Sequence, residues 1–68
     1  MAETMTVNGK AYPYATGMTV SSLLAAMHGG PEKVVVEVNG DIIPGECYGL
    51  TFLNGGDTIE IVYFVGGG

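Results

Sequence analysis

A single stretch of this sequence has the periodicity of an amphipathic α-helix, which limits the chain to folds in which one helix packs against strands. Four apolar side chains recur at the spacing i, i+3, i+4 and i+7, on one helix face: Val20, Leu23, Leu24 and Met27. Thr19 stands before them as the predicted N-cap, whose hydroxyl accepts a hydrogen bond from the first turn. The glycine pair at 29–30, followed by Pro31, then ends the helix.

Short strands are predicted on both sides of this helix. Asn-Gly dipeptides at 8–9 and 39–40 favour tight hairpin turns, because both turn positions require positive φ. Pro13 cannot donate a ladder hydrogen bond, so its strand should lie at a sheet edge. Alternating or β-branched apolar side chains place strands at residues 4–8, 11–15, 34–38, 41–43 and 58–65.

The order of these elements predicts an α+β fold: a mixed, about five-stranded sheet with one main helix packed on one face. The first and last strands should be parallel central neighbours. This arrangement matches the β-grasp, the ubiquitin-like architecture. We expect residues 1–65 to form the β-grasp domain and residues 66–68 to form a flexible glycine tail, since 68 residues suffice for only one domain.

Three further segments carry aromatic or apolar side chains that we expect to contribute to the core. Tyr12 and Tyr14 share one face of their strand at a spacing of two residues. They could cover either the core or a partner, and we favour packing within the hairpin or against the core. The stretch 46–51 should be irregular or form a brief helical turn, with Tyr48 and Leu50 directed inward. The pair Phe52-Leu53 should anchor the segment before the last strand.

Charge and composition exclude several partner classes. Seven acidic residues against Lys10 and Lys33 give a net charge of −5, which repels nucleic acid and anionic lipid. The negative charge favours a protein partner with a basic face. Alternatively, it serves only to keep the protein in solution. The N-terminus lacks the features of a signal peptide, and no apolar run reaches membrane-spanning length. The lone Cys47 cannot form an internal disulfide, so we expect a cytoplasmic protein.

No group of side chains in this sequence predicts catalysis or metal binding. A Cys47–His28 nucleophile pair would need a third orienting group and a cleft, and a metal site would need more ligands than these two. We therefore expect no catalytic and no metal-binding residues. His28 falls in the last helical turn, where the helix dipole favours a cation, and Cys47 should be a small, partly buried side chain.

The last strand leads directly into glycine. Ile59 and Ile61 should face the core, which leaves Val62 and Phe64 on the outer face; together with Val65 they form a candidate partner-binding patch beside the tail. The three residues Gly66-Gly67-Gly68 could reach roughly 10 Å when extended. Taken alone, such a tail fits either a frayed terminus or a segment that enters the active site of a partner.

The sequence resembles the ThiS family, the small sulfur carriers of thiamine biosynthesis. The resemblance covers nearly the whole chain and rests on Thr-Val-Ser-Ser-Leu-Leu at 19–24, Val-Asn-Gly-Asp-Ile-Ile-Pro at 38–44, Gly-Asp-Thr-Ile-Glu-Ile at 56–61 and the final Gly67-Gly68. Gly66 extends the family's diglycine to three glycines. The small subunit of molybdopterin synthase shares the Gly-Asp before the last strand and the diglycine, but tends to be longer.

The resemblance implies a carrier rather than an enzyme. An E1-like (ThiF-like) adenylyltransferase would use ATP and magnesium to adenylate the Gly68 carboxylate, and a sulfur donor would convert it to a thiocarboxylate. The sulfur would then pass to a ThiG-like thiazole synthase, and the chain itself would hold no cofactor. A molybdopterin-synthase subunit and a ubiquitin-like protein modifier, both of which would use the same glycine end, are the alternatives. A binding module with an irrelevant tail is a further one.

Overall fold

The computed structural model describes residues 3–28 and 33–64, with the side chain of His28 outside the description. In chain order, the elements are β1 (Thr4–Val7), β2 (Lys10–Pro13), α1 (Val20–His28), β3 (Val34–Val38), β4 (Asp41–Ile43), a short 3-10 helix (Gly45–Cys47) and β5 (Thr58–Tyr63). The predicted order of strands and helix is confirmed.

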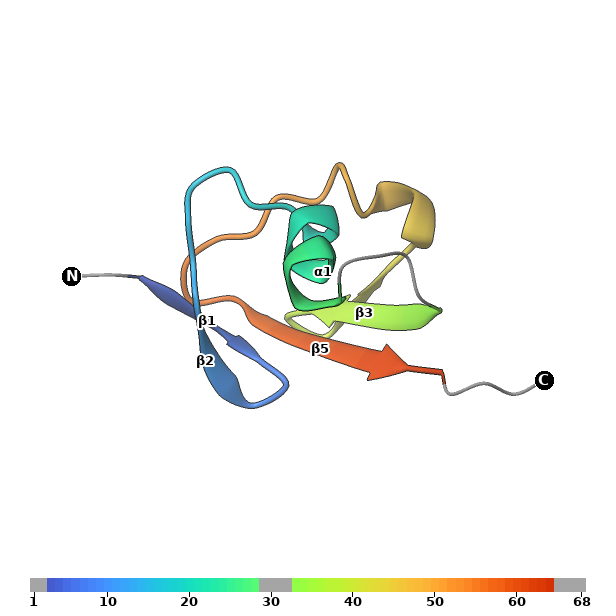
Figure 1. Ribbon diagram of the computed structural model, residues 1–68, viewed down its shortest axis with the longest axis horizontal. Helices are drawn as coiled ribbons and strands as arrows, with labels where there is room; N and C mark the ends of the chain where they lie inside the picture. The colour runs from blue at the N-terminus through green and yellow to red at the C-terminus, as the bar shows by residue number, and fades with distance from the viewer. Residues whose placement is uncertain (1–2, 29–32, 65–68) are drawn as a thin grey trace.

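The strands form one five-stranded sheet in the order β2-β1-β5-β3-β4. β1 and β5 run parallel at its centre, and every other neighbouring pair is antiparallel. Helix α1 crosses one face of this sheet, together with the segment that joins the 3-10 helix to β5 (Figure 1). This is the predicted β-grasp arrangement, and β2, the strand with Pro13, lies at an edge as expected.

Both Asn-Gly dipeptides form the tight turns that the sequence predicts. Asn8 and Gly9 have φ values of 50° and 83°, and Asn39 and Gly40 have 52° and 88°. Positive φ at both positions matches the twist of a two-residue hairpin to that of its strands. The second turn is further held by Asn39, whose amide donates to Asp57 Oδ1 at 3.0 Å.

Helix α1 begins at a reciprocal cap. The backbone N–H of Ser22 donates to Thr19 Oγ1 at 3.1 Å, and the backbone N–H of Thr19 donates to Ser22 Oγ at 2.8 Å. This arrangement is a capping box in which serine stands where glutamate or glutamine is usual, and it satisfies two otherwise unpaired donors. The predicted N-cap at Thr19 is confirmed.

The core lies between α1 and the sheet. The buried side chains come from α1, from β1, β3 and β5, and from the segment before β5: Met5, Val7, Val20, Leu23, Val36, Leu53, Ile59 and Ile61. Tyr12, Tyr14 and Tyr48 are partly buried and pack against this cluster, as predicted. No buried polar or charged side chain is found in the described part of the chain.

Two predictions for the segment before β5 are wrong. Leu50 was expected in the core but is 77% exposed. Leu50 follows the 3-10 helix in a tight turn, in which its N–H donates to the Cys47 carbonyl. Tyr48 packs against the core instead, and its hydroxyl donates to the Val34 carbonyl. Phe52, expected to anchor the segment with Leu53, is 64% exposed. The backbone there is extended, so that burial of Leu53 turns Phe52 outward.

Candidate functional site

Strand β5 carries the chain from the centre of the sheet to one end of the molecule (Figure 1). Its ladder with β3 continues to the last residue of the strand, where Tyr63 lies opposite Val34. One further backbone hydrogen bond follows, from the N–H of Phe64 to the carbonyl of Lys33 at 3.0 Å. The backbone is therefore held in place up to Phe64. Val65, Gly66, Gly67 and Gly68, which the sequence places at the site, lie outside the described residues.

The two faces of β5 differ as the sequence predicts. Ile59 and Ile61 are buried against α1. Val62 is 51% exposed and Phe64 is 59% exposed. The expectation that these two side chains are accessible beside the end of the chain is therefore confirmed; their contact with a partner stays a prediction.

Val62 belongs to a wider surface on the side of the sheet that α1 does not cover. In the β3–β5 ladder, Val35 lies opposite Val62, and Glu37 lies opposite Glu60. In the neighbouring ladder, Glu37 also lies opposite Ile42, which is 67% exposed. Directly opposed residues share a face of the sheet. We call this surface the open face and define it by Val35, Glu37, Ile42, Glu60, Val62 and Phe64.

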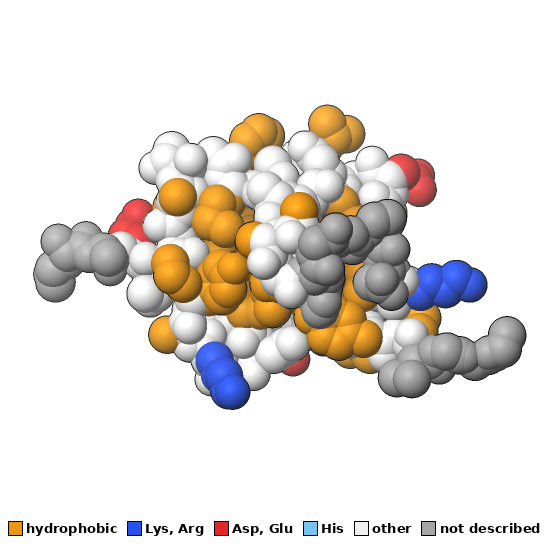
Figure 2. Space-filling model, viewed as in Figure 1, with side chains coloured by type: hydrophobic (Ala, Val, Ile, Leu, Met, Phe, Trp, Pro, Cys, Tyr) orange, Lys and Arg blue, Asp and Glu red, His pale blue; other side chains and the backbone are white. Residues whose placement is uncertain are grey.

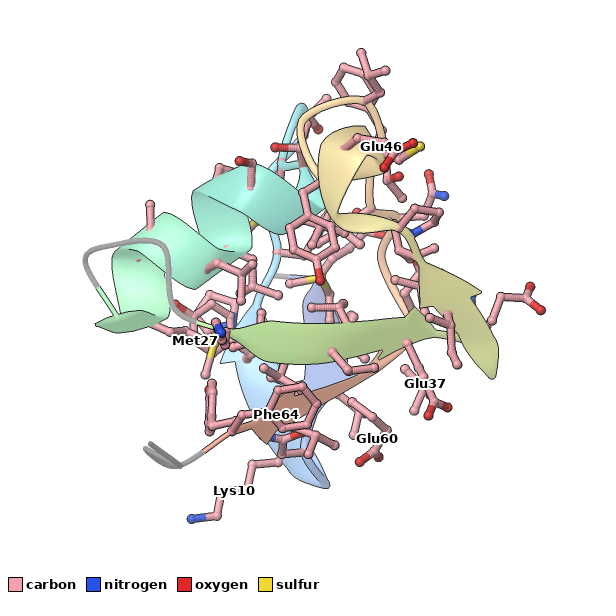
Figure 3. All side chains as sticks on the ribbon, turned by 90° about the vertical axis from the view of Figure 1, so that its right-hand side faces the viewer. Lys10, Met27, Glu37, Glu46, Glu60 and Phe64 are labelled. Carbon is pink, nitrogen blue, oxygen red and sulfur yellow. The ribbon has the colours of Figure 1, made fainter. Side chains whose placement is uncertain are left out.

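The open face combines apolar and acidic side chains. Figure 3 shows Glu37 and Glu60 extending side by side from the sheet, away from α1, with Phe64 nearby. Neither carboxylate forms an ion pair or a side-chain hydrogen bond with a described residue. In the view of Figure 1, the space-filling surface shows apolar side chains gathered near the middle of the molecule, with a few single ones at its upper edge (Figure 2).

The sequence missed Ile42 and Glu37 as members of this surface. Alternation within residues 34–38 is enough to direct Glu37 away from the core, but it does not show that Glu60 lies opposite Glu37. That pairing depends on the register between two strands separated by 19 residues of intervening chain, from 39 to 57. Local patterns do not report such a register.

The described residues contain no other candidate centre. Cys47 is half-buried at the end of the 3-10 helix, as expected, and His28 is the last residue of α1. Within residues 3–28 and 33–64, no three histidine, cysteine, aspartate or glutamate residues are close enough to hold a metal ion. No described helix is long and apolar enough to span a membrane.

Comparison with known proteins identifies the family to which the chain belongs. The model of the ThiS family matches residues 5–68, which is nearly the whole chain and includes the terminal glycines. The chain belongs to the ThiS family. Its fold is that of a crystal structure of the thiamine biosynthesis protein (ThiS) from Geobacter metallireducens, with a TM-score of 0.74, 38% identity and coverage of 96% of this chain and 99% of that one. A solution structure of a thiamine biosynthesis protein from the same organism gives a TM-score of 0.75 at 37% identity, and covers 96% of this chain and 87% of that one.

Longer relatives are also similar to this ThiS-family chain. A thiazole synthase from Paramagnetospirillum magneticum is 39% identical over 64 residues, which are 94% of this chain but 20% of that protein. A thiazole synthase from Magnetococcus marinus is 39% identical over 62 residues, or 91% of this chain and 19% of that protein. The chain therefore spans about a fifth of the length of these curated relatives.

Proposed function

We propose that this chain is the sulfur carrier for thiazole formation in thiamine biosynthesis, with the Gly68 carboxylate as the site of attachment. The observation that carries the proposal is the ThiS-family match over residues 5–68, which extends through the diglycine at the end of the sequence. The chain supplies a carboxylate to partner enzymes and catalyses no step itself. It is a protein co-substrate, formed by a body of residues 1–65 and a tail of residues 66–68.

The chemistry at Gly68 requires activation, because a carboxylate is ionised near neutral pH and is a poor electrophile. In the activating step, an oxygen of the Gly68 carboxylate attacks the α-phosphorus of ATP and pyrophosphate leaves. A nucleophilic sulfur from a donor then attacks the acyl carbon and AMP leaves. With hydrosulfide (HS⁻) as that sulfur, a C–S bond forms as the C–O bond to AMP breaks, and loss of the remaining proton gives a thiocarboxylate on Gly68. ATP and magnesium belong to an E1-like, ThiF-like adenylyltransferase rather than to this chain.

The geometry of β5 suits such a carrier. The backbone is fixed by hydrogen bonds up to Phe64, and four residues, 65–68, follow it. Four residues span at most about 14 Å when extended. Since Gly66, Gly67 and Gly68 have no side chains, this segment fits a narrow channel that would exclude larger residues. The partner can thus hold Gly68 at its reacting atoms while Val62, Phe64 and Val65 contact its outer surface.

A ThiG-like thiazole synthase is the proposed acceptor of the sulfur. Two relatives whose sequence includes a region like this chain are named thiazole synthase, and that region makes up about a fifth of each. A shared chain would keep a carrier at high effective concentration beside the enzyme that it supplies. A carrier on a separate chain can supply the same thiazole synthase by docking on it through the open face of the carrier.

Complementation tests the proposal. The chain should restore growth without thiamine to a strain that lacks its own carrier, when its ThiF-like and ThiG-like partners are supplied with it. The variant Gly67→Val and a variant without Gly68 should accumulate as folded protein but should not restore growth. Rescue of a molybdoenzyme-deficient strain instead, or rescue of the thiamine strain by either glycine variant, would contradict the proposal.

A further inference from the structure

Two carboxylates oppose each other at the centre of the open face. Glu37 of β3 and Glu60 of β5 are direct partners in the antiparallel ladder, and Figure 3 shows both side chains on the side away from α1. Like charges in this position destabilise a sheet. No described residue offers either carboxylate an ion pair or a side-chain hydrogen bond. Among the residues that the structure describes, nothing therefore compensates the repulsion between Glu37 and Glu60.

Apolar side chains surround this acidic pair. Val62 and Val35 form an opposed pair two residues along the same ladder, and Ile42 lies on the other side of Glu37. Val62, Ile42 and Phe64 are each more than half exposed. A partner that covers these side chains also removes water from the two carboxylates. Burial of a carboxylate is costly unless a cation with hydrogen-bond donors meets it.

The two opposed carboxylates and the exposed apolar side chains around them favour a partner surface that is apolar and carries a cation. We propose that the open face docks on an apolar protein surface that carries one arginine, and that this arginine inserts between Glu37 and Glu60. A guanidinium is planar and has five N–H donors, so that one arginine can bond to two carboxylates at once, whereas a lysine ammonium acts as a compact point charge. The inference rests on the proposed function, since it takes the ThiF-like activating enzyme as the partner.

Binding to the purified activating enzyme tests the inference. The variants are Glu37→Gln, Glu60→Gln and the double variant, compared with wild-type protein by surface plasmon resonance. Glu46→Gln is the matched control for the single variants, because Glu46 is an exposed carboxylate on the 3-10 helix, outside the open face (Figure 3). The double variant should bind about 30-fold or more weakly, as is typical when one side of a buried charged pair is lost. The control should stay within about 2-fold of wild type, as a remote surface charge does.

Salt and stability provide two independent readouts. The ratio of wild-type to double-variant affinity should change little between low and high salt, because a pair that is buried on docking is screened much less than exposed charges. In the free protein, removal of the repulsion should raise the midpoint of thermal unfolding by about 1 to 8 °C. Weaker binding by a more stable protein cannot be attributed to misfolding.

The possible outcomes separate the inference from the proposed function. If wild-type protein is adenylated at Gly68 but the double variant binds as tightly as wild type, the inference is overturned and the carrier function stands. Equal weakening by Glu46→Gln and Glu37→Gln would also overturn it, because general charge attraction would then explain the effect. If wild-type protein is neither bound nor adenylated, the proposed function fails and the inference fails with it.

Discussion

Asn8 joins the first hairpin to the last strand, and its replacement tests how the fold holds β5. The backbone N–H of Asn8 donates to the Ile59 carbonyl at 2.9 Å, and its side-chain Oδ1 accepts from the N–H of Ile61 at 2.7 Å. The side-chain bond continues the pairing of β1 with β5 beyond Val7, where the ladder ends. Asn8 also has a φ of 50°, in the left-handed region that asparagine tolerates better than most residues.

The variant Asn8→Ala should lose stability for two reasons. Ile61 is 5% exposed, so its N–H would lose its acceptor in a partly buried position, which costs about 1 to 3 kcal/mol. Alanine in the left-handed region costs roughly 1 to 2 kcal/mol more. The sum is about 2 to 5 kcal/mol, whereas a domain of this length has roughly 3 to 10 kcal/mol in total. The midpoint of thermal unfolding should therefore fall by at least about 8 °C.

Thermal unfolding followed by far-UV circular dichroism measures this loss, and two further variants separate its causes. Asn8→Gly removes the acceptor but tolerates positive φ, so it should lie between alanine and wild type. Asn8→Asp keeps both the acceptor and the tolerance of positive φ, and should lie near wild type. Equal unfolding midpoints for the alanine and glycine variants would show that the positive φ at residue 8 adds no cost for alanine. A wild-type midpoint for both would refute the contribution of Asn8 to the fixing of β5.

Three further variants test other parts of the structure. Thr19→Ala removes the side-chain half of the helix cap and should lower the unfolding free energy in urea by about 0.5 to 2 kcal/mol; an unchanged value would show that the cap does not contribute. Leu50→Ser should change the unfolding free energy by less than about 0.5 kcal/mol, since the side chain is 77% exposed. A larger loss would show that Leu50 contributes to the core. Phe64→Ala should weaken binding to the activating enzyme about 10-fold or more while leaving the unfolding midpoint unchanged. Wild-type affinity would exclude Phe64 from the docking surface.

Much of the fold follows from local sequence signals in this chain. The apolar stripe of α1, the cap at Thr19 and the Asn-Gly turns each act within a few residues, and the structure confirms them. The parallel pairing of β1 with β5 was predicted from the order of the elements, which matches a β-grasp, and not from a local signal. Regular elements with strong local preferences can thus be derived without long-range information.

The segment between β4 and β5 was less predictable. Its apolar side chains were assigned to the core, yet the core has room for Leu53 and for part of Tyr48 but not for Leu50 or Phe52. Which apolar residues of an irregular segment turn inward depends on its contacts with distant residues, such as the bond from Tyr48 to Val34. Hydrophobicity alone does not decide this, because folded proteins expose many apolar side chains.

The candidate site could be predicted only in part. The outward direction of Val62 and Phe64 follows from alternation in the last strand, and the structure confirms it. The meeting of Glu37 with Glu60 depends on strand register, which appears only when β3 and β5 are paired. The role proposed for Gly68 rests on the family to which the chain belongs, since no local pattern distinguishes a functional glycine end from a frayed one.

The intact mass of the protein tests the central claim most directly. The chain is incubated with its ThiF-like enzyme, ATP, magnesium and a sulfide source, and its mass is measured before and after. The proposal predicts a gain equal to the replacement of one oxygen by one sulfur, assigned by fragmentation to Gly68 and absent when ATP is omitted. An unchanged mass in the presence of an enzyme that is active on another carrier, or a sulfur located at Cys47, would contradict it.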